Sequence, residues 1–370
     1  MTGRVALPAL REALLAHLRE TSGCADLAYR HAPEPMAGGF STASIHAFEL
    51  EAAPAGLDGP LVLRVLSGSD SEPRWARETL VQGTAARLGF PTPRLRLVGA
   101  EAVGLGGPFV VMDRLAGGKL IRWWTAWLLA GVGAAWVLGS PWPLLVGHAV
   151  GCACVGLVMA RYQRRLHRLP VASVREACVE RGVAFEALSA RVWMDTAQRA
   201  ITAQRLDGYA PGLQWLRAHE PAIARAVLCH GDIQPLNFMA TWTRVTGILD
   251  WELACVADPE LDVATTKCDV LLLPGPWLGA VFWPLYAFYV LGLGRGLDRA
   301  RLRYYEALRA FVMLAMVAEQ FRATQANKAA GVPEPAGTAP DLPPFFARML
   351  IRAHERRFRR LTGVAIAERA

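Results

Sequence analysis

One series of acidic and amide side chains, within residues 228–262, constrains the fold of this chain more than any other feature. The tripeptide His-Gly-Asp ends at Asp232 and follows a short apolar run, and Asn237 stands five positions later. Residues 245–249 are apolar and β-branched enough for a buried strand, which would place Asp250 at its end. The sequence therefore predicts three oxygen donors on short loops between strands.

This order of donors suits the transfer of a phosphoryl group from a nucleotide. Such a transfer needs a carboxylate near the acceptor hydroxyl and further oxygen ligands for Mg²⁺, with little covalent work by the protein. We expect Asp232 to accept the proton of the acceptor hydroxyl or to orient it, and Asn237 and Asp250 to hold the metal. ATP and Mg²⁺ are the cofactors that this site predicts.

These residues resemble the aminoglycoside phosphotransferase and choline kinase superfamily, whose hallmark is His-Gly-Asp, an Asn five residues later and a strand that ends in Asp-Trp or Asp-Phe. Here that strand ends in Asp250 and Trp251. Residues 257–262 are similar to the family's Gly-Asp-Pro-x-x-Asp element, with Ala in place of Gly. A lone His-Gly-Asp could be an ordinary loop, but three elements in order argue against chance. The resemblance implies that His230 and Asp262 shape the catalytic loop.

The resemblance also implies a fold: an α+β, bilobal, protein-kinase-like architecture. Its parts would be a small N-terminal lobe with an antiparallel sheet, a hinge, and a mainly helical C-terminal lobe. We expect the nucleotide-binding lobe over residues 1–118, an apolar helical hairpin over 119–168 and the catalytic lobe over 169–370.

Two segments of the N-terminal lobe are expected to contact the nucleotide. Gly38, Gly39 and Ser41 predict a turn whose backbone approaches the phosphates, although two glycines between strands also form ordinary hairpin turns. A later apolar run that contains Met112 and Asp113 resembles the family's strand and hinge, whose backbone would bind adenine. The alternative for this run is a core strand that ends in a glycine turn.

Arg64 is the single cation in the apolar run 61–66, at the position where kinases carry the lysine that binds the α- and β-phosphates. An arginine keeps the positive charge but is planar and bulkier. Glu78 lies on a predicted helix over 72–88 and is our candidate for the carboxylate that orients Arg64. The competing interpretation of Glu78 is a surface residue on a solvated helix face.

The composition sets broader limits. A chain of 370 residues with 53% hydrophobic content is long enough for two lobes with ample cores. Its seven cysteines are scattered in neither a zinc spacing nor a disulfide framework, which predicts a reducing compartment. The net charge of +8 suits anionic ligands or an anionic membrane surface. Nucleic acid is not an expected partner, because no recognition motif accompanies the charge.

A charge-free run extends from Trp123 to Ala160 and contains five of the twelve tryptophans. It divides near residues 140–143 into halves that would each span roughly 26 Å as helices, against a hydrocarbon core of about 30 Å. Arg122 precedes the run and several arginines follow it, as expected for the cytoplasmic side. The two lobes must meet across ATP and so must lie on the same side of a membrane. Only a hairpin or a re-entrant wedge is compatible with that requirement and with membrane contact.

We favour membrane contact through residues 123–160, with a second contribution from the uncharged stretch 270–294, whose prolines argue against a straight span. Two apolar helices buried on the C-terminal lobe are the alternative. The expected location is the cytoplasm, at the cytoplasmic face of the membrane. The sequence gives no basis for predicting an oligomeric state.

The acceptor pocket of this family lies in its variable helical part. The family's substrates cover aminoglycosides, macrolides, choline and sugars. Residues 171–221 hold few acidic side chains and many arginines, which favours an uncharged, anionic or lipidic alcohol over a polycation. An antibiotic phosphotransferase is the first alternative. A pseudokinase or nucleotide-binding regulator at the membrane is the second, because Arg64 replaces the usual lysine.

Overall fold

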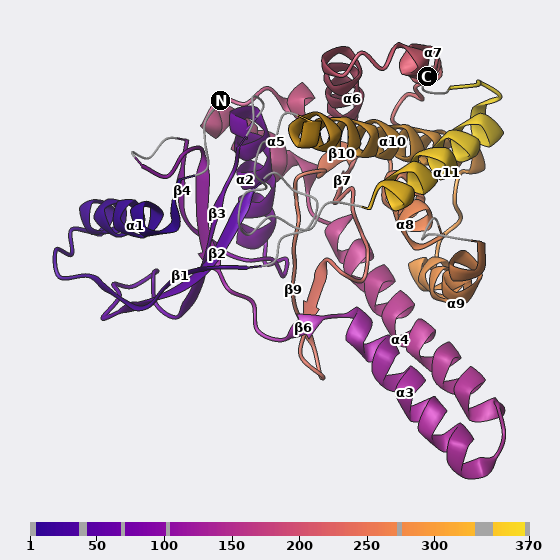
Figure 1. The fold of residues 1–370 in the computed structure, drawn as a ribbon, viewed down its shortest axis with the longest axis horizontal. Helices are drawn as coiled ribbons and strands as arrows, with labels where there is room; N and C mark the ends of the chain where they lie inside the picture. Colours follow the sequence, from indigo (N-terminus) through magenta and orange to yellow (C-terminus); the bar gives the residue numbers. More distant parts are fainter. Residues whose placement is uncertain are drawn as a thin grey trace.

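The computed structural model describes residues 5–36, 43–67, 71–100, 104–271, 276–329 and 343–366. Figure 1 shows two lobes, a small one built around a sheet and a larger helical one, with a helical hairpin that projects from the larger lobe. This arrangement agrees with the predicted α+β, bilobal architecture.

The N-terminal lobe is a five-stranded antiparallel sheet in the order β1-β2-β3-β5-β4. Its strands are β1 (Ala28–Pro35), β2 (Ser44–Glu51), β3 (Pro60–Val65), β4 (Leu95–Gly99) and β5 (Phe109–Asp113). Alternate side chains of β3 point to opposite faces of the sheet. Leu61 and Leu63 pack against α1 (Leu7–Ser22), whereas Arg64 faces α2 (Ser71–Arg87). One face of the sheet is therefore apolar core, and the other carries a buried charge.

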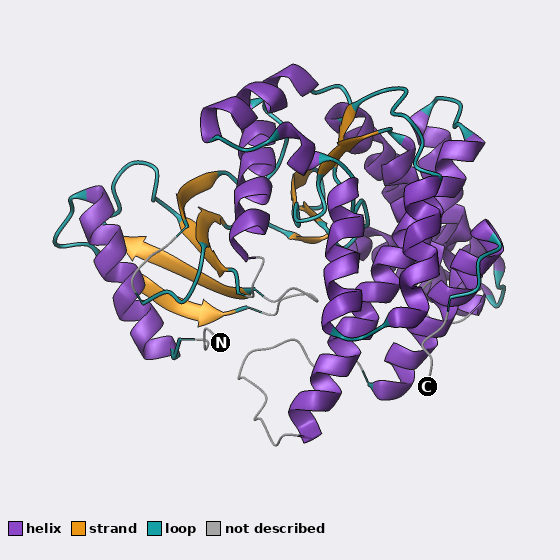
Figure 2. Cartoon of the chain, turned by 90° about the horizontal axis from the view of Figure 1, so that it is seen from above, coloured by secondary structure: helices purple, strands orange, loops and turns teal. Residues whose placement is uncertain are grey.

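The C-terminal lobe contains two small sheets among helices, β6-β8-β9 and β10-β7. The strands are β6 (Gly118–Lys119), β7 (Val227–Cys229), β8 (Phe238–Ala240), β9 (Val245–Ile248) and β10 (Cys255–Ala257). The helices are α5 (Val171–Arg181), α6 (Arg191–Ala203), α7 (Ala210–Ala218), α8 (Glu260–Leu271), α9 (Pro276–Leu293), α10 (Arg299–Ala329) and α11 (Pro344–Thr362). Two short 3₁₀ turns, η1 (Phe185–Leu188) and η2 (Asp207–Tyr209), join them. As Figure 2 shows, the helices stand together on one side of the molecule and the large sheet on the other.

The hairpin consists of α3 (Ile121–Leu138) and α4 (Trp142–Leu166). Its two helices cross closely, because a side chain on Gly131 would lie 2.6 Å from the carbonyl oxygen of Pro143. The second half of α4 is buried between the lobe and α9, where Gly156 lies against the backbone of Leu285. No described element gives such cover to the first half of α4 or to most of α3.

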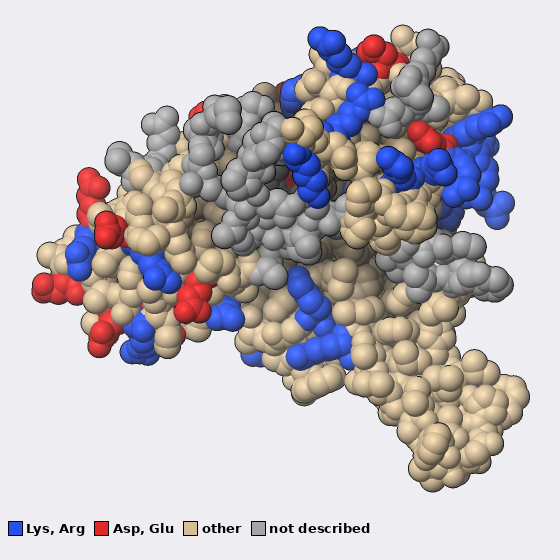
Figure 3. All heavy atoms as spheres, in the orientation of Figure 1, with Lys and Arg blue, Asp and Glu red and all other residues tan. Residues whose placement is uncertain are grey.

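The projecting part of the hairpin exposes large apolar side chains. Trp136 is 89% exposed, Val137 81% and Trp142 70%. In Figure 3 the projection carries no charged side chain on the face shown, and Lys and Arg side chains gather beside its base. The predicted helical hairpin is thus present, and it stands away from the body at its tip.

Candidate active site

The catalytic loop joins β7 to β8 and is held in shape by one buried carboxylate. Asp262, at the start of α8, accepts hydrogen bonds from the backbone N–H groups of Gly231 (2.7 Å) and His230 (3.2 Å) and contacts Nε2 of His167 at 2.8 Å. Gly231 has a φ of 79°, and a side chain there would overlap the carbonyl oxygen of Leu253. A glycine is therefore required at this turn. The structure places Asp262 where the sequence predicted a loop-shaping residue.

His230 is completely buried and its ring lies 4.7 Å from that of Trp251, centroid to centroid. Burial lowers the pKa of His230, so its imidazole is neutral at physiological pH. A neutral ring packed behind the loop is placed for support of the loop rather than for proton transfer.

Both carboxylate oxygens of Asp232 are engaged by side chains. One oxygen accepts a hydrogen bond from Nη2 of Arg309 at 2.7 Å, and the other accepts from Gln234 (2.9 Å) and from Nδ2 of Asn237 (2.6 Å). Burial by itself would raise the pKa of Asp232, but Arg309 and the two amides hold that pKa below its usual value. Asp232 is consequently an ionised carboxylate, as a group that receives or orients a hydroxyl proton must be.

Asp250 follows β9 and is one of three non-glycine residues with positive φ in the described chain, at 68°. This conformation is uncommon for a residue with a side chain and is often kept where function requires it. The side chain of Asp250 is exposed at its surface, but the protein atoms packed around it displace part of its hydration. This desolvation, together with the charges of Glu252 and Asp232, raises the pKa of Asp250 to about 8. Nearby carboxylates therefore act on Asp250 against the guanidinium of Arg64, which by itself would lower its pKa.

A divalent cation fits this donor set. The amide nitrogen of Asn237 is used on the backbone oxygen and the carboxylate of Asp232, which leaves its amide oxygen as a ligand atom. Asp250 supplies a carboxylate with two further carboxylates, Asp232 and Glu252, near it. Mg²⁺ prefers such oxygen ligands, and would supply charge neutralisation for the phosphates when bound.

Arg64 lies in a buried ion-pair network. It pairs with Glu78 from α2 and, at 3.4 Å, with Glu252, which stands two residues after Asp250. Burial by itself would lower the pKa of Arg64, but Glu78, Asp250 and Glu252 raise it, so the guanidinium stays charged. Glu78 is 5% exposed, which rules out the interpretation as a solvated surface residue. Arg64 and Glu78 are thus positioned as a lysine–glutamate pair would be in a kinase.

Five further residues were predicted to contact the nucleotide, and the structure describes only two of them. Gly38, Gly39 and Ser41 lie outside the described residues. Met112 and Asp113 end β5 at the junction of the lobes, but the N–H of Asp113 donates to the carbonyl oxygen of Arg94 and its carboxylate pairs with Arg96. Nucleotide contact by these five residues stays a prediction.

Three residues of this site were not predicted from the sequence. Gln234 stands two residues after Asp232, and its position inside the motif could have indicated it. Glu252 could have been indicated in the same way, because it closes the Asp-Trp-Glu tripeptide. Arg309 lies 77 residues from Asp232 on α10, and no local pattern connects the two.

The sequence profile of the phosphotransferase enzyme family matches residues 44–312, which include the whole of this site. The chain belongs to that family. It is 29% identical over 197 residues to the aminoglycoside 3'-phosphotransferase of Streptomyces fradiae, an alignment that covers 50% of this chain and 68% of that protein. A 64-residue segment, 17% of the chain, is 41% identical to acyl-CoA dehydrogenase family member 10 of Mus musculus and covers 6% of it.

Solved structures of the family share the fold. A thermostable mutant of aminoglycoside phosphotransferase APH(4)-Ia has a TM-score of 0.53 at 16% identity, with 95% of this chain and 100% of that chain covered. A choline/ethanolamine kinase family protein from Mesorhizobium loti has a TM-score of 0.51 at 16% identity, with 96% and 94% covered. The predicted protein-kinase-like fold and the predicted superfamily are both confirmed.

As a member of this family the protein is a small-molecule kinase, which transfers phosphate to a hydroxyl group. Its cofactors are ATP and Mg²⁺. The residues described above perform what such a reaction asks of a protein. We expect Asp232 to receive or orient the acceptor hydroxyl, and Asn237 and Asp250 would hold the Mg²⁺ that, with Arg64, would offset the negative charge of the phosphates.

Proposed function

We propose that the acceptor of this kinase is an uncharged, anionic or lipidic alcohol and that the protein works at the cytoplasmic face of a membrane. The observation that carries the first part is the contact between Arg309 and Asp232. Arg309 is 2% exposed and comes from α10, so a cation is built into the wall beside the catalytic carboxylate.

The neighbouring side chains of that wall are also rich in cations. Glu306, one turn before Arg309, pairs with Lys267 and at 2.8 Å with Arg357 from α11. His354, on α11, is buried, and its pKa is lowered to about 3 by burial and by the nearby arginines. The carboxylates of Asp232 and Glu306 are thus each paired with an arginine or a lysine. A polycationic aminoglycoside needs free carboxylates, whereas an anionic or neutral alcohol does not.

The membrane part of the proposal rests on the hairpin. Helices α3 and α4 are long and apolar enough to cross a membrane by length and composition. A core helix passes the same test, but such a helix is mostly buried. In the apolar window of α3 only 6% is buried, against 39% in that of α4. Exposing large apolar side chains to water is unfavourable, so a lipid environment suits the tip of this hairpin.

A second contribution would come from α9, which packs along α4 and exposes Leu291, Trp283 and Val281. Pro284 stands inside α9, so the helix is suited to lie against the membrane rather than to cross it. A substrate that resides in the bilayer would then be presented from the side of the molecule that carries the hairpin.

A second candidate function is phosphorylation of an antibiotic, which the similarity to the aminoglycoside 3'-phosphotransferase favours. The pseudokinase alternative has less support, because Arg64 is fully charged, is paired with Glu78 and lies near an intact set of Asp232, Asn237 and Asp250.

Transfer of radiolabelled phosphate from ATP tests the acceptor proposal directly. The screen would compare aminoglycosides, neutral sugars, hydroxy acids, sugar phosphates and diacylglycerol, with the wild-type protein and an Asp232→Asn variant. We expect product from a neutral, anionic or lipidic alcohol, and none from the variant. Aminoglycosides as the best acceptors would refute the acceptor proposal and support the antibiotic one.

A further inference from the structure

We propose that Thr266 is a positioning residue for the catalytic carboxylate, and that its hydroxyl ends a buried row of polar side chains that begins on the hairpin helix α4. The row runs from Gln163 on α4 through Tyr289 on α9 to Thr266 on α8, and all three side chains are completely buried. It reaches the catalytic loop at Ile233, the residue after Asp232. The inference depends on the phosphotransfer activity of the family, and not on the acceptor or the membrane contact proposed above.

Helix α8 holds the catalytic loop on both sides of Asp232. Asp262 accepts the backbone N–H groups of the two residues just before Asp232. Thr266 lies one turn later on the same face of α8, and its Oγ1 donates to the carbonyl oxygen of Ile233 at 2.7 Å. The peptide group at Ile233 leads directly into Gln234, whose side chain donates to Asp232. Fixing this carbonyl group therefore fixes the backbone from which the carboxylate and one of its partners project.

The contact with Ile233 distinguishes Thr266 from an ordinary threonine in a helix. The hydroxyl of Thr266 also lies 2.9 Å from the carbonyl oxygen of Asp262, four residues earlier, and such contacts are common within helices. Thr265 makes a similar contact at 3.0 Å and has no hydrogen bond to the catalytic loop among the described residues. The single proton of Thr266 cannot serve two acceptors fully, and the shorter distance favours the loop.

Two rows of polar contacts connect α8 to the end of α4. In the first row, the hydroxyl oxygen of Tyr289 lies 3.3 Å from Oγ1 of Thr266, and Tyr289 donates to Oε1 of Gln163. In the second row, His167 contacts Asp262 at 2.8 Å. Gln163 and His167 are four residues apart on α4, and the two rows also end four residues apart on α8. Each helix therefore uses one face for both rows.

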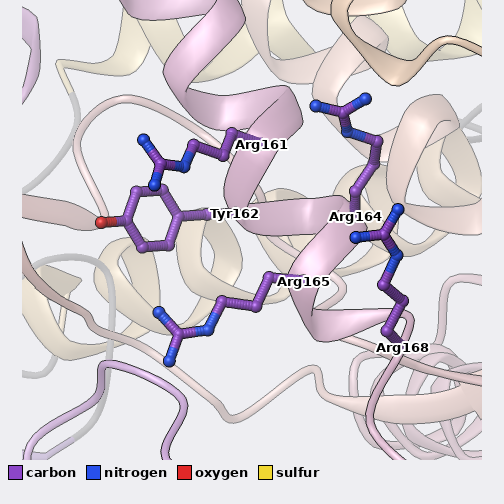
Figure 4. Close-up of a pocket in the computed structure, with 5 residues that line it drawn as sticks. All are labelled: Arg161, Tyr162, Arg164, Arg165 and Arg168. Carbon is purple, nitrogen blue, oxygen red and sulfur yellow. The ribbon is translucent and has the colours of Figure 1, made fainter.

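The end of α4 is fixed against the lobe. Figure 4 shows that the arginines of this turn, among them Arg161 and Arg164, extend away from the helix, whereas Gln163 between them is buried. Helix α9 packs closely on the same part of α4, because a side chain on Gly292 would lie 2.8 Å from Cβ of Ala160. The start of the row is thus held by packing, as a group that positions others must be.

Variants of the two adjacent threonines test this role in the full chain. Thr266→Val removes the hydroxyl at nearly constant volume, Thr266→Ser keeps it, and Thr265→Val is the matched control. The measured activity is the release of radiolabelled phosphate from Mg·ATP to water, which requires no knowledge of the acceptor. We expect Thr266→Val to lower kcat about tenfold with an unchanged KM for ATP, because a small displacement of a catalytic group costs this much. Thr266→Ser should recover most of kcat, and Thr265→Val should keep it.

Hydrogen exchange of the backbone amides of residues 228–237, followed by mass spectrometry, gives a readout that does not depend on turnover. Thr266→Val should speed exchange in this segment about tenfold, and Thr265→Val should not. Tyr289→Phe should give a smaller change there, since its contact with Thr266 at 3.3 Å is weaker than the contact of Thr266 with the loop.

Each contrary outcome overturns the positioning role for a different reason. Equal losses of kcat in the two valine variants would show a general effect on the core. A serine variant as slow as the valine variant would assign the effect to packing of the methyl group. A raised KM for ATP with kcat retained would place the effect at the nucleotide. Unchanged hydrogen exchange in Thr266→Val would refute the role whatever the rate of hydrolysis, and failure of the acceptor or membrane proposals would change none of these results.

Discussion

Replacing Arg309 by Gln should destabilise the protein chiefly by leaving the charge of Asp232 buried without a cation. The guanidinium lies 2.7 Å from the carboxylate, and both side chains are largely buried. Removing one partner of such a pair costs about 3–5 kcal/mol. When Asp232 is first changed to Asn, the carboxylate charge is gone and the same Arg309→Gln change removes a buried guanidinium that has lost this partner, so the change should cost no more than about 1 kcal/mol, the usual value of a hydrogen bond.

Urea denaturation of the four proteins of this double-mutant cycle measures the difference. We expect a coupling free energy of about 2–4 kcal/mol between the two positions. Arg303→Gln, an exposed arginine on the same helix that donates to the carbonyl oxygen of Leu361, is the control and should cost less than about 1 kcal/mol. Equal costs of Arg309→Gln in both backgrounds, within about 0.5 kcal/mol, would refute the view that Arg309 compensates the catalytic carboxylate.

Three further changes test other parts of the structure. Arg64→Met should raise the KM for ATP about tenfold and lower the free energy of unfolding by about 3–5 kcal/mol, since Glu78 stays buried without its cation; an unchanged KM would contradict the phosphate role. Gly231→Ala should lower the melting temperature by several degrees and abolish transfer, because a side chain there overlaps a backbone oxygen; normal activity would contradict the tight turn. The folded-state pKa of His354 is about 3, below the unfolded value of about 6.5, so only the unfolded chain takes up this proton as pH falls. Acidification from pH 7 to 5.5 should therefore cost about 1.2 kcal/mol that His354→Gln does not show in urea titrations; equal slopes would contradict its burial.

The sequence indicated the catalytic loop well because its chemistry is local. Asp232 and Asn237 are five residues apart on one loop, and Asp250 comes just after β9, the second strand beyond that loop. The spacing along the chain therefore nearly fixes their spacing in the fold. The ion pair between Arg64 and Glu78 followed from the order of a strand and a helix. Such short-range relations leave a pattern that a single sequence displays.

Arg309 left no such pattern. It lies on α10, and an arginine among the apolar residues of a long helix is equally consistent with an exposed side chain. Only the packing of α10 against α8 and α6 places it on the catalytic carboxylate. The surroundings of the acceptor, with Glu306 between Lys267 and Arg357, likewise depend on contacts between helices that are far apart in the chain.

The amino-acid sequence by itself determined the family, the oxygen donors and a charge-free hairpin, because each depends on residue type and short spacing. Tertiary structure alone decided that α3 leaves its apolar side chains exposed while the second half of α4 is covered by α9. Hydrophobicity along a chain is the same for a buried helix and a lipid-facing one. What distinguishes them is whether a neighbouring element packs against that face, and this depends on the three-dimensional arrangement of the whole lobe.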